Sequence, residues 1–317
     1  MKSTVRALCL IAFLCSSGAA LPAFGQVDLR SDLRSKFEAD LKRINDEFQG
    51  VMGVQFVDLT DGQKIGLNAA TVFPTASAIK VAILVELFRR ADQTPGLLQQ
   101  QRSFAANERT ANSGMARLIG AGSSLALEDV AKLMINLSEN TATNILIDEL
   151  GMANVNHLTE SLGLKTIKLQ RKMLDTETQA GDKENLASPA DAAALMTRIA
   201  KCDLPVSQAA CAGIRGILEI PSPPHPSKDF IPKEIPVAFK WGGMEGVMTA
   251  WAIVNLPDRP YVFAIMTTYG IDNAPAVRAA SQAAYNYFWK LGRANRYGAR
   301  VSLESMQKAR TRAAQPQ

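Results

Sequence analysis

Apolar residues recur at three- and four-residue steps near the start of the chain. The pattern consists of Leu29, Leu33, Phe37, Leu41, Ile44 and Phe48. Residues with this spacing lie on one face of a helix. We therefore expect an amphipathic helix over residues 28–48 that packs against another layer.

Patterns typical of β-strands occur at both ends of the chain. Residues 51–59 and 64–67 flank an Asp61-Gly62 turn and predict a hairpin. Three further strands are expected over residues 237–241, 248–254 and 261–268, followed by a helix over 274–291. The fold class is therefore α+β, a two-lobe arrangement in which terminal helices flank a five-stranded antiparallel sheet.

The middle of the chain, residues 77–219, is almost entirely helical in pattern. Ser124 is expected to begin a helix over 125–137, and Ser188-Pro189 to begin one over 189–200. The resulting domains are an α/β lobe (26–76 and 237–292) and an inserted helical lobe (77–236). The helical lobe contains a loop of little periodicity (165–188) and a proline-rich loop (221–236).

The first 25 residues have the composition of a secretory signal peptide. Lys2 and Arg6 precede an apolar run over 7–15, and small residues before Gln26 suit a peptidase. A buried N-terminal helix is the alternative, and a lipoprotein fits less well because bulky Leu14 precedes Cys15. We expect a secreted or periplasmic protein without stable membrane insertion, since no internal segment approaches the ~18 apolar residues of a spanning helix.

Composition and charge indicate a globular protein. The chain has 317 residues, 47% of them hydrophobic, and a net charge of +5 that falls to +3 once residues 1–25 are removed. The basic surplus lies in residues 293–317, for which we expect a disordered tail. No pattern of stacking aromatic residues accompanies it, so nucleic-acid binding is not expected. We expect a monomer.

The cysteine and histidine content restricts the chemistry. Cys9 and Cys15 leave with the signal peptide, so Cys202 and Cys211 remain as a pair and predict a disulfide in an exported protein. The only histidines are His157 and His225, in unrelated contexts. Neither a histidine-rich metal site nor a Ser-His-Asp triad is expected.

Ser77-Ala78-Ile79-Lys80 precedes an apolar run that predicts a buried helix. Residues three apart share a helix face, so Lys80 can act as base for the Ser77 hydroxyl once burial lowers its pKa. A helix N-cap role for Ser77 is the alternative. The same spacing in Ser305-Met306-Gln307-Lys308 lies in the polar tail, where nothing buries the lysine.

Two further motifs follow at a distance. They are Ser138-Glu139-Asn140, after the helix 125–137, and Lys240-Trp241-Gly242, at the end of a strand. Together with Ser77-x-x-Lys80, they resemble the three motifs of the serine β-lactamase and penicillin-binding protein family, and class A β-lactamases most closely. The resemblance extends to Phe73-Pro74 and Gly181-Asp182 and covers nearly the whole mature chain.

The resemblance implies a role for each matched residue. Ser77 is the acylated nucleophile, Lys80 its base, and Ser138 relays a proton to the leaving nitrogen. The backbone N–H groups of Ser77 and Gly243 form the oxyanion hole. No metal or organic cofactor is implied.

The resemblance also implies a substrate-binding edge. Asn140 binds the side-chain amide of the substrate, and Lys240 attracts its carboxylate beside Trp241, Gly242 and Gly243. Trp241 removes the hydroxyl that helps such a lysine and places an indole beside the cleft; the alternative is that the indole points into the core. Glu139 replaces an aspartate, which is a mild change.

The largest departure lies in the Ω-loop, where class A enzymes hold a glutamate that activates the deacylating water. Counting back from Pro189 without gaps places Lys172 at that position and Thr176 where an asparagine is usual. Asp175 or Glu177 could supply the base only in a differently shaped loop.

These features predict an acyl-enzyme on Ser77 and β-lactam hydrolysis with slow deacylation. The alternatives are a penicillin-binding-type peptidase or transpeptidase, another ester or amide hydrolase, and a non-catalytic binding protein.

Overall fold

The computed structural model describes residues 29–110, 118–120, 122–295 and 297–313. The segment interpreted as a signal peptide lies outside these residues.

A five-stranded antiparallel sheet forms the centre of the α/β layer, as predicted. Its order is β2-β1-β9-β8-β7, with β1 (Val51–Asp58), β2 (Lys64–Leu67), β7 (Val237–Met244), β8 (Val247–Val254) and β9 (Tyr261–Thr268). β1 pairs along its whole length with β9, from Val51 opposite Thr268 to Asp58 opposite Tyr261. The two ends of the chain therefore meet in one sheet, and β7 lies at its edge.

β7 is longer than the sequence predicts. The pattern indicates a strand that ends at residue 241, whereas Gly242 and Gly243 continue the ladder opposite Thr249 and Met248. Glycine has low strand propensity, which hides this extension from the sequence. The added residues are the ones that approach Ser77.

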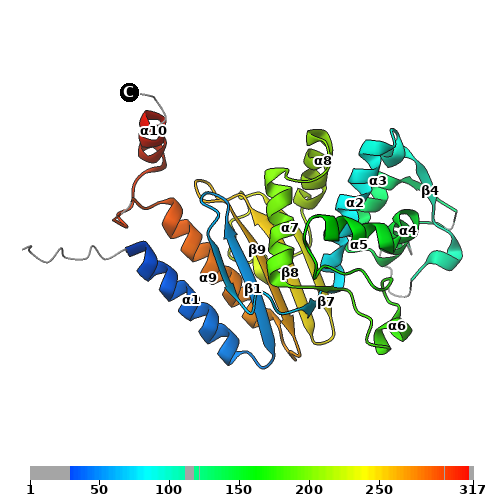
Figure 1. Cartoon of the computed structure of the whole chain (residues 1–317), viewed down its shortest axis with the longest axis horizontal. Helices are drawn as coiled ribbons and strands as arrows, with labels where there is room; N and C mark the ends of the chain where they lie inside the picture. The colour runs from blue at the N-terminus through cyan, green and yellow to red at the C-terminus, as the bar shows by residue number, and fades with distance from the viewer. Residues whose placement is uncertain (1–28, 111–117, 121, 296, 314–317) are drawn as a thin grey trace, which may run out of the picture.

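Two terminal helices cover one face of the sheet. They are α1 (Leu29–Glu47) and α9 (Ala274–Gly292), which lie side by side in Figure 1. The Phe37 ring of α1 stacks on Tyr287 of α9, with centroids 4.7 Å apart, and meets Phe56 of β1 at 5.3 Å. The apolar stripe predicted from the sequence is therefore the face that contacts the sheet.

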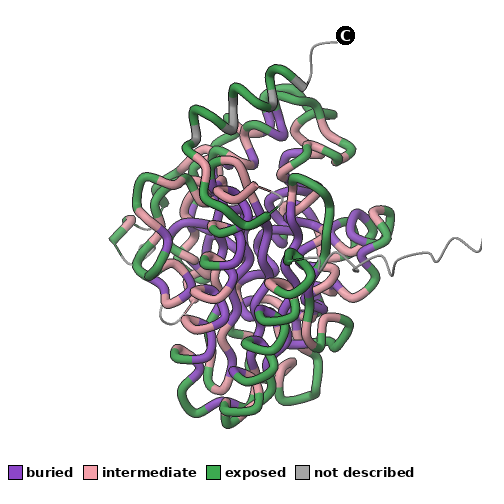
Figure 2. The backbone as a smooth tube through the Cα atoms, turned by 90° about the vertical axis from the view of Figure 1, so that its left-hand side faces the viewer, coloured by how far each residue is buried: buried purple, intermediate pink, exposed green. Residues whose placement is uncertain are grey.

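The inserted helices cover the opposite face. They are α2 (Lys80–Gln93), α3 (Leu127–Asn136), α4 (Asn140–Leu150), α5 (Met152–Ser161), α7 (Pro189–Lys201) and α8 (Gln208–Glu219). α7 packs on β1, β8 and β9, and α8 packs on β7. Figure 2 shows the buried backbone concentrated in the middle of the molecule.

Short elements complete the helical layer. β3 (Phe73–Pro74) pairs with β6 (Leu186–Ala187), and β4 (Gln101–Ser103) pairs with β5 (Ser124–Ala126). Short helices are η1 (Ala76–Ile79), η2 (Leu97–Gln99), η3 (Ala106–Glu108), α6 (Thr176–Ala180) and η4 (Pro226–Lys228).

One predicted helix start is confirmed and one is wrong. The Ser188 side chain accepts a hydrogen bond from the Asp191 N–H and caps α7, as expected. Ser124 does not begin α3. It lies in β5, and the N-cap of α3 is Ala126, because the backbone at 124–126 pairs with β4 before the helix begins.

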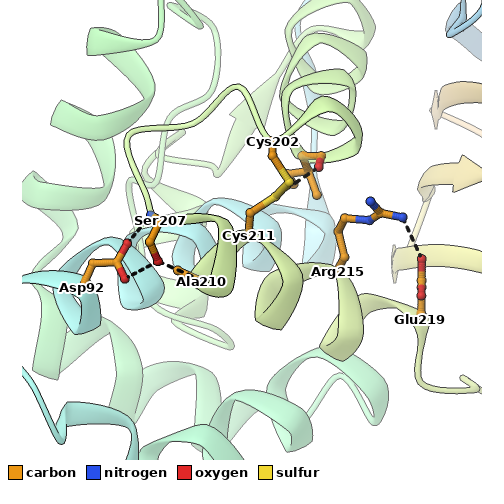
Figure 3. The surroundings of a disulfide bond; sticks show 8 residues. Asp92, Cys202, Ser207, Ala210, Cys211, Arg215 and Glu219 are labelled. Atoms are coloured by element: carbon orange, nitrogen blue, oxygen red, sulfur yellow. Dashed lines mark hydrogen bonds and ion pairs between the residues drawn. A yellow bond between two sulfur atoms is a disulfide. The ribbon is translucent and has the colours of Figure 1, made fainter.

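The predicted disulfide between Cys202 and Cys211 is present, with Cα atoms 5.7 Å apart. Figure 3 shows that it joins the end of α7 to α8. Ser207, between them, caps α8 and donates its hydroxyl to Asp92 at 2.8 Å. The connection between α7 and α8 is thus held by the disulfide, by the Ser207 cap and by the hydrogen bond to Asp92.

The segment after α9 contains a helix, α10 (Leu303–Ala313), where the sequence predicts a disordered tail. Lys308 and Glu304 form an exposed pair one turn apart, which favours a helix. α10 projects away from the body in Figure 1. Within the described residues, no helix combines the length and apolar character needed to span a membrane.

Candidate active site

Ser77 lies in η1, which runs directly into α2. α2 crosses the interior of the helical layer, and every residue from Lys80 to Phe88 is buried. The N-cap residues of η1 and α2 are Thr75 and Ile79, so Ser77 does not have the capping role that the alternative interpretation requires. Its half-buried side chain instead lines a cavity.

Lys80 is fully buried at the first turn of α2. Its Nζ donates to the carbonyl oxygen of Ser138 at 2.8 Å and to Oδ1 of Asn140 at 3.0 Å, and lies 3.3 Å from Oγ of Ser138. A hydrogen bond to Ser77, expected if Lys80 is to act as its base, is not among the bonds that Lys80 makes to described residues. The amine is turned toward the second motif.

The pKa of Lys80 falls from 10.5 to about 7 because the ammonium is removed from water, although the Glu139 carboxylate acts in the opposite direction. A substantial fraction of the amine is therefore neutral near pH 7. A neutral amine can accept a proton, which the ordinary lysine cannot do at this pH.

The second motif forms the turn between α3 and α4. Ser138 has a φ of +54°, and Glu139 caps α4 by accepting the Ala142 N–H at 2.5 Å. This cap buries the Glu139 carboxylate and places Ser138 and Asn140 on either side of it, both within reach of Lys80. The longer side chain of glutamate serves this cap.

The third motif lies on the edge strand β7. Lys240 is fully buried, and its Nζ donates to the carbonyl oxygen of Trp241 at 2.8 Å. Burial, together with the nearby charge of Lys80, lowers the pKa of Lys240 well below its usual value. The two buried lysine amines, from different elements, therefore lie close enough for the charge of Lys80 to favour the neutral form of Lys240.

Gly242 packs directly on the backbone at Ser77. A Cβ atom at Gly242 would lie 2.6 Å from the Ser77 nitrogen and 2.7 Å from the Thr75 carbonyl oxygen. Gly243 has open space instead, with its nearest neighbours at 3.9 Å or more, and lines the cavity with Ser77. Because β7 is an edge strand, part of its N–H groups face this space rather than a neighbouring strand.

Trp241 points away from the cavity and is not among its lining residues. Its half-buried ring packs with the core between the sheet and α9, and lies 5.0 Å from Nζ of Lys240 and 5.9 Å from the His225 ring. The ring therefore has the core placement considered from the sequence.

The cavity has a volume of about 450 Å³. Its lining residues are Ala76, Ser77, Asn140, Arg171, Met173, Leu174, Thr176, Gln179, Asn185, Gly243, Met244 and Glu245. It thus joins Ser77 of the first motif, Asn140 of the second, and Gly243, the residue after the third, to the loop between α5 and α7. Within the described residues, no group of three or more His, Cys, Asp and Glu side chains is arranged to hold a metal ion.

In the Ω-like loop, the residue that faces the cavity is not the one that the gap-free count places there. Lys172 does not face the cavity, because its Nζ pairs with the Asp148 carboxylate at 2.6 Å on the outside of α4. Met173, only 7% exposed, lines the cavity instead. Its N–H donates to Oδ1 of Asn144 at 2.8 Å, which fixes the loop in this register.

Neither candidate acid of the loop lines the cavity. Asp175 caps α6 and accepts from both the N–H and the hydroxyl of Thr178, which lowers the pKa of its carboxyl group. Glu177 is exposed in the first turn of that helix. The acid that does line the cavity, Glu245, is an exposed residue of the turn after β7.

A polar network that the sequence did not reveal holds the ends of the loop together. Arg171, 7% exposed, makes two hydrogen bonds to Glu184 at 3.0 and 2.9 Å. Gln179 also donates to Glu184 at 2.9 Å, and its amide lies 3.5 Å from the sulfur of Met244 on β7. The sequence signal for this network was the pair of opposite charges, Arg171 and Glu184, near the two ends of a loop without periodicity.

The fold and the cluster around Ser77 agree with the comparison to known families. A model described as the β-lactamase enzyme family matches residues 36–288, and the chain belongs to this family. It is a relative of the class A β-lactamases, as the three motifs predicted.

Among characterised relatives, β-lactamase SME-1 of Serratia marcescens is 26% identical over 59% of this chain. The carbapenem-hydrolyzing β-lactamase KPC of Klebsiella oxytoca is also 26% identical over 59%. The aligned regions span 64% and 62% of these relatives, less than two thirds of their length.

Among solved structures, a β-lactamase from Sphaerobacter thermophilus DSM 20745 is 27% identical with a TM-score of 0.72, covering 79% of this chain and 95% of its own. The structure of PBP-A is 26% identical with a TM-score of 0.73, covering 82% and 97%.

Proposed function

We propose that the protein is a serine hydrolase that is acylated on Ser77 by β-lactams and releases the acyl group slowly. The observation that carries this proposal is the buried Lys80 amine, with a pKa near 7, bonded to Ser138 and Asn140 beside the half-exposed Ser77. The characterised relatives named above are β-lactamases, which supports the substrate class.

In the proposed acylation, the Ser77 oxygen forms a bond to the β-lactam carbonyl carbon. Its proton passes to the neutral Lys80 amine, which must turn from Asn140 toward Ser77. The negative oxygen of the tetrahedral intermediate is stabilised by the N–H groups of Ser77 and Gly243. The carbon–nitrogen bond then breaks, and Ser138 passes a proton from Lys80 to the leaving nitrogen.

Substrate contacts are proposed on both sides of Ser77. Asn140 donates to the side-chain amide of the substrate from one wall of the cavity. Lys240 attracts the substrate carboxylate from the other side, since burial without a paired acid favours a bound anion. Gly242 contributes by its small size, which allows β7 to approach Ser77.

Slow deacylation follows from the loop. Hydrolysis of the ester requires a base beside the attacking water, and Met173 supplies none. Glu184, at the end of the loop, is unsuited to this step because its carboxylate is already bonded to Arg171 and Gln179. The acyl-enzyme is therefore expected to persist.

Intact mass after mixing with penicillins and cephalosporins tests the proposal. A shift equal to one acyl group, absent in Ser77→Ala, is expected, followed by weak turnover. Fast hydrolysis without a burst would show that another group supplies the deacylation base. No added mass with any β-lactam tested would contradict the substrate assignment.

A penicillin-binding-type peptidase is the second candidate. The apolar Met173 and the similarity to PBP-A, of which a variant has been solved as an acyl-enzyme with penicillin G, favour it. Cleavage of a D-alanyl peptide by wild type but not by Ser77→Ala would assign this activity.

We also propose export, on the basis of the N-terminal pattern and the Cys202–Cys211 disulfide. Mass spectrometry of the mature protein should place its first residue at Gln26.

A further inference from the structure

The end of the chain carries the basic surplus of the protein. Residues 290–312 contain seven lysines and arginines and one acid, Glu304, which gives a net charge of +6. Residues 26–289 contain 26 basic and 29 acidic residues, a net charge of −3. Such a charge asymmetry between two parts of one chain is typical of a protein that binds an anionic partner through its basic part.

A tight hairpin after α9 folds part of this charge back onto the body. The Val301 N–H donates to the carbonyl oxygen of Arg293 at 3.1 Å, which returns Arg300 to the end of α9. The guanidinium groups of Arg293 and Arg300 lie over the Trp289 ring, 5.5 and 4.4 Å from its centre. These cation–π contacts hold both cations beside one aromatic ring and leave their charge in place.

A cavity of about 310 Å³ lies between this hairpin and the start of α1. Besides the two arginines, its lining includes Lys36 of α1 and Lys290 of α9, and Asp32 is the acid among the lining residues. None of the four cations forms an ion pair with another described residue. Because like charges repel one another, an anion bound among them lowers the electrostatic energy of the site.

Apolar and aromatic side chains accompany the positive charge. Leu29, 49% exposed, lines the same cavity, and Tyr297 in the hairpin is 59% exposed. The Trp289 ring between the arginines is half-buried. Tryptophan and tyrosine beside lysine and arginine are the residues that proteins place at a membrane–water interface, where the phosphates of the lipids meet apolar chains. A soluble polyanion requires only the charge, so this composition favours a lipid surface.

The position of this end of the molecule suits docking. α10 follows the hairpin and adds exposed basic residues, among them Lys308 and Arg312. In Figure 1, the start of α1, the end of α9 and α10 lie at one end of the molecule, and α4 and α6, which contribute to the cavity beside Ser77, lie toward the other. A surface bound at the basic end therefore leaves the Ser77 cavity open to solvent.

We propose that Lys36, Lys290, Arg293 and Arg300 around Trp289, together with α10, form a docking surface for an anionic phospholipid bilayer. The lipid phosphates bind the four cations, and the Trp289 ring lies at the level of the headgroups. The association is peripheral and reversible, since it depends on charge at the surface and on few apolar side chains. The proposed export of the protein supplies its meeting with such a bilayer, and the chemistry at Ser77 takes no part.

Co-sedimentation with lipid vesicles provides the first test. The chain that begins at Gln26 is used, because it contains every described residue and lacks the apolar run over 7–15. It should bind vesicles that contain phosphatidylglycerol and not vesicles of phosphatidylcholine alone. Raising NaCl from ~0.05 to ~0.5 M should release it, because salt screens the attraction. Equal binding to both kinds of vesicle, or binding to neither, would overturn the proposal, whether or not Ser77 is acylated by β-lactams.

Two double variants with the same change of charge provide the second test. Arg293→Glu with Arg300→Glu should weaken binding to phosphatidylglycerol vesicles at least about tenfold, from the usual contribution of each basic residue near an anionic surface. Lys165→Glu with Lys201→Glu is the matched control, since both lysines are exposed on the helical layer, and it should weaken binding less than about threefold. The unfolding midpoint of each variant checks its fold. Equal losses would assign binding to net charge alone and overturn the docking surface.

Hydrogen exchange on the unaltered protein locates the contact without any variant. Phosphatidylglycerol vesicles should slow exchange of backbone N–H groups in the hairpin and in α10 and leave those of α4 and α6 unchanged. Slower exchange in α4 or α6 alone would place the contact elsewhere and overturn the proposal.

Soluble anions separate a lipid surface from other sources of phosphate. Inorganic phosphate and polyphosphate, at the phosphate concentration of the vesicles, should displace little of the bound protein. Complete displacement by polyphosphate would make the basic end a site for a soluble polyanion, and complete displacement by inorganic phosphate would make the cavity a site for a small anion. Either result would overturn the assignment to a bilayer.

Discussion

The protonation state of Lys80 sets the expected pH dependence of acylation. Its pKa is lowered to about 7, so the amine is protonated below that pH and neutral above it. Only the neutral amine accepts the Ser77 proton, and the acylation rate should therefore rise as pH increases through about 7. The rate of mass gain measured from pH 5 to 9 tests this expectation. A rate that falls over the same range would exclude Lys80 as the base.

Two adjacent glycines make a matched pair of variants. Gly242→Ala places a methyl group 2.6 Å from the Ser77 nitrogen, so β7 must move away and acylation should fall by about a hundredfold or more, as for the loss of an oxyanion-hole donor. Gly243→Ala meets nothing closer than 3.9 Å and keeps its N–H, so its effect should be small. Equal effects in the acylation assay would contradict this geometry.

The loop residue that faces the cavity can be identified by adding a base. Met173→Glu places a carboxylate in the cavity and should speed deacylation by about tenfold or more. Lys172→Glu should not, because that side chain points to Asp148 on the outside. Decay of the acyl-enzyme followed by mass spectrometry distinguishes them. If only Lys172→Glu accelerated deacylation, the gap-free count, which places Lys172 at the position of the deacylating glutamate, would be correct.

Individual positions show where sequence patterns carry information. The spacing of Ser77 and Lys80, and the order of the three motifs, were readable because chemistry requires those residue types. The sequence did not show that Met173, and not Lys172, faces the cavity, because counting positions does not show which side chain turns inward. The pairing of Lys172 with Asp148 and the bond of Asn144 to Met173 decide that, and both involve residues of α4.

At the scale of elements, the Cys202–Cys211 link holds α7 to α8. The bridge closes a loop with a sequence separation of 9, which corresponds to about 2–3 kcal/mol of stabilisation. Cys202→Ala with Cys211→Ala should lower the midpoint of thermal unfolding by about 5–10 °C. Acylation at 25 °C should persist, because the bridge lies outside the cavity lining. Reduction of the wild type should give the same shift, and an unchanged midpoint would show that Ser207 and Asp92 suffice.

Strong periodicity made the long elements predictable. α1, α7 and α9 and the strands of the sheet were located to within a few residues because burial on one side leaves a regular pattern. Short elements were missed, since β5 is formed by pairing with β4 and not by its own propensity. α10, beyond the body, combines helix-forming residues with a polar composition that suggested disorder.

The whole molecule should tolerate loss of its last helix. α10 has exposed charges and projects from the body (Figure 1), and none of its described side chains lines the cavity beside Ser77. A chain ending at residue 302 should keep the acylation rate within about twofold and its unfolding midpoint within about 2 °C. A large loss in either measurement would give α10 a role in the fold.

The pairing of β1 with β9 has a consequence for how the chain acquires its structure. Val51 pairs with Thr268, so about 200 residues are synthesised between the two partners. β1 and β2 alone form a hairpin, which is marginally stable in water. The sheet therefore cannot close until nearly all of the polypeptide has left the ribosome. Completion of the sheet is therefore a late, long-range step in folding, and it follows synthesis of the whole inserted helical lobe.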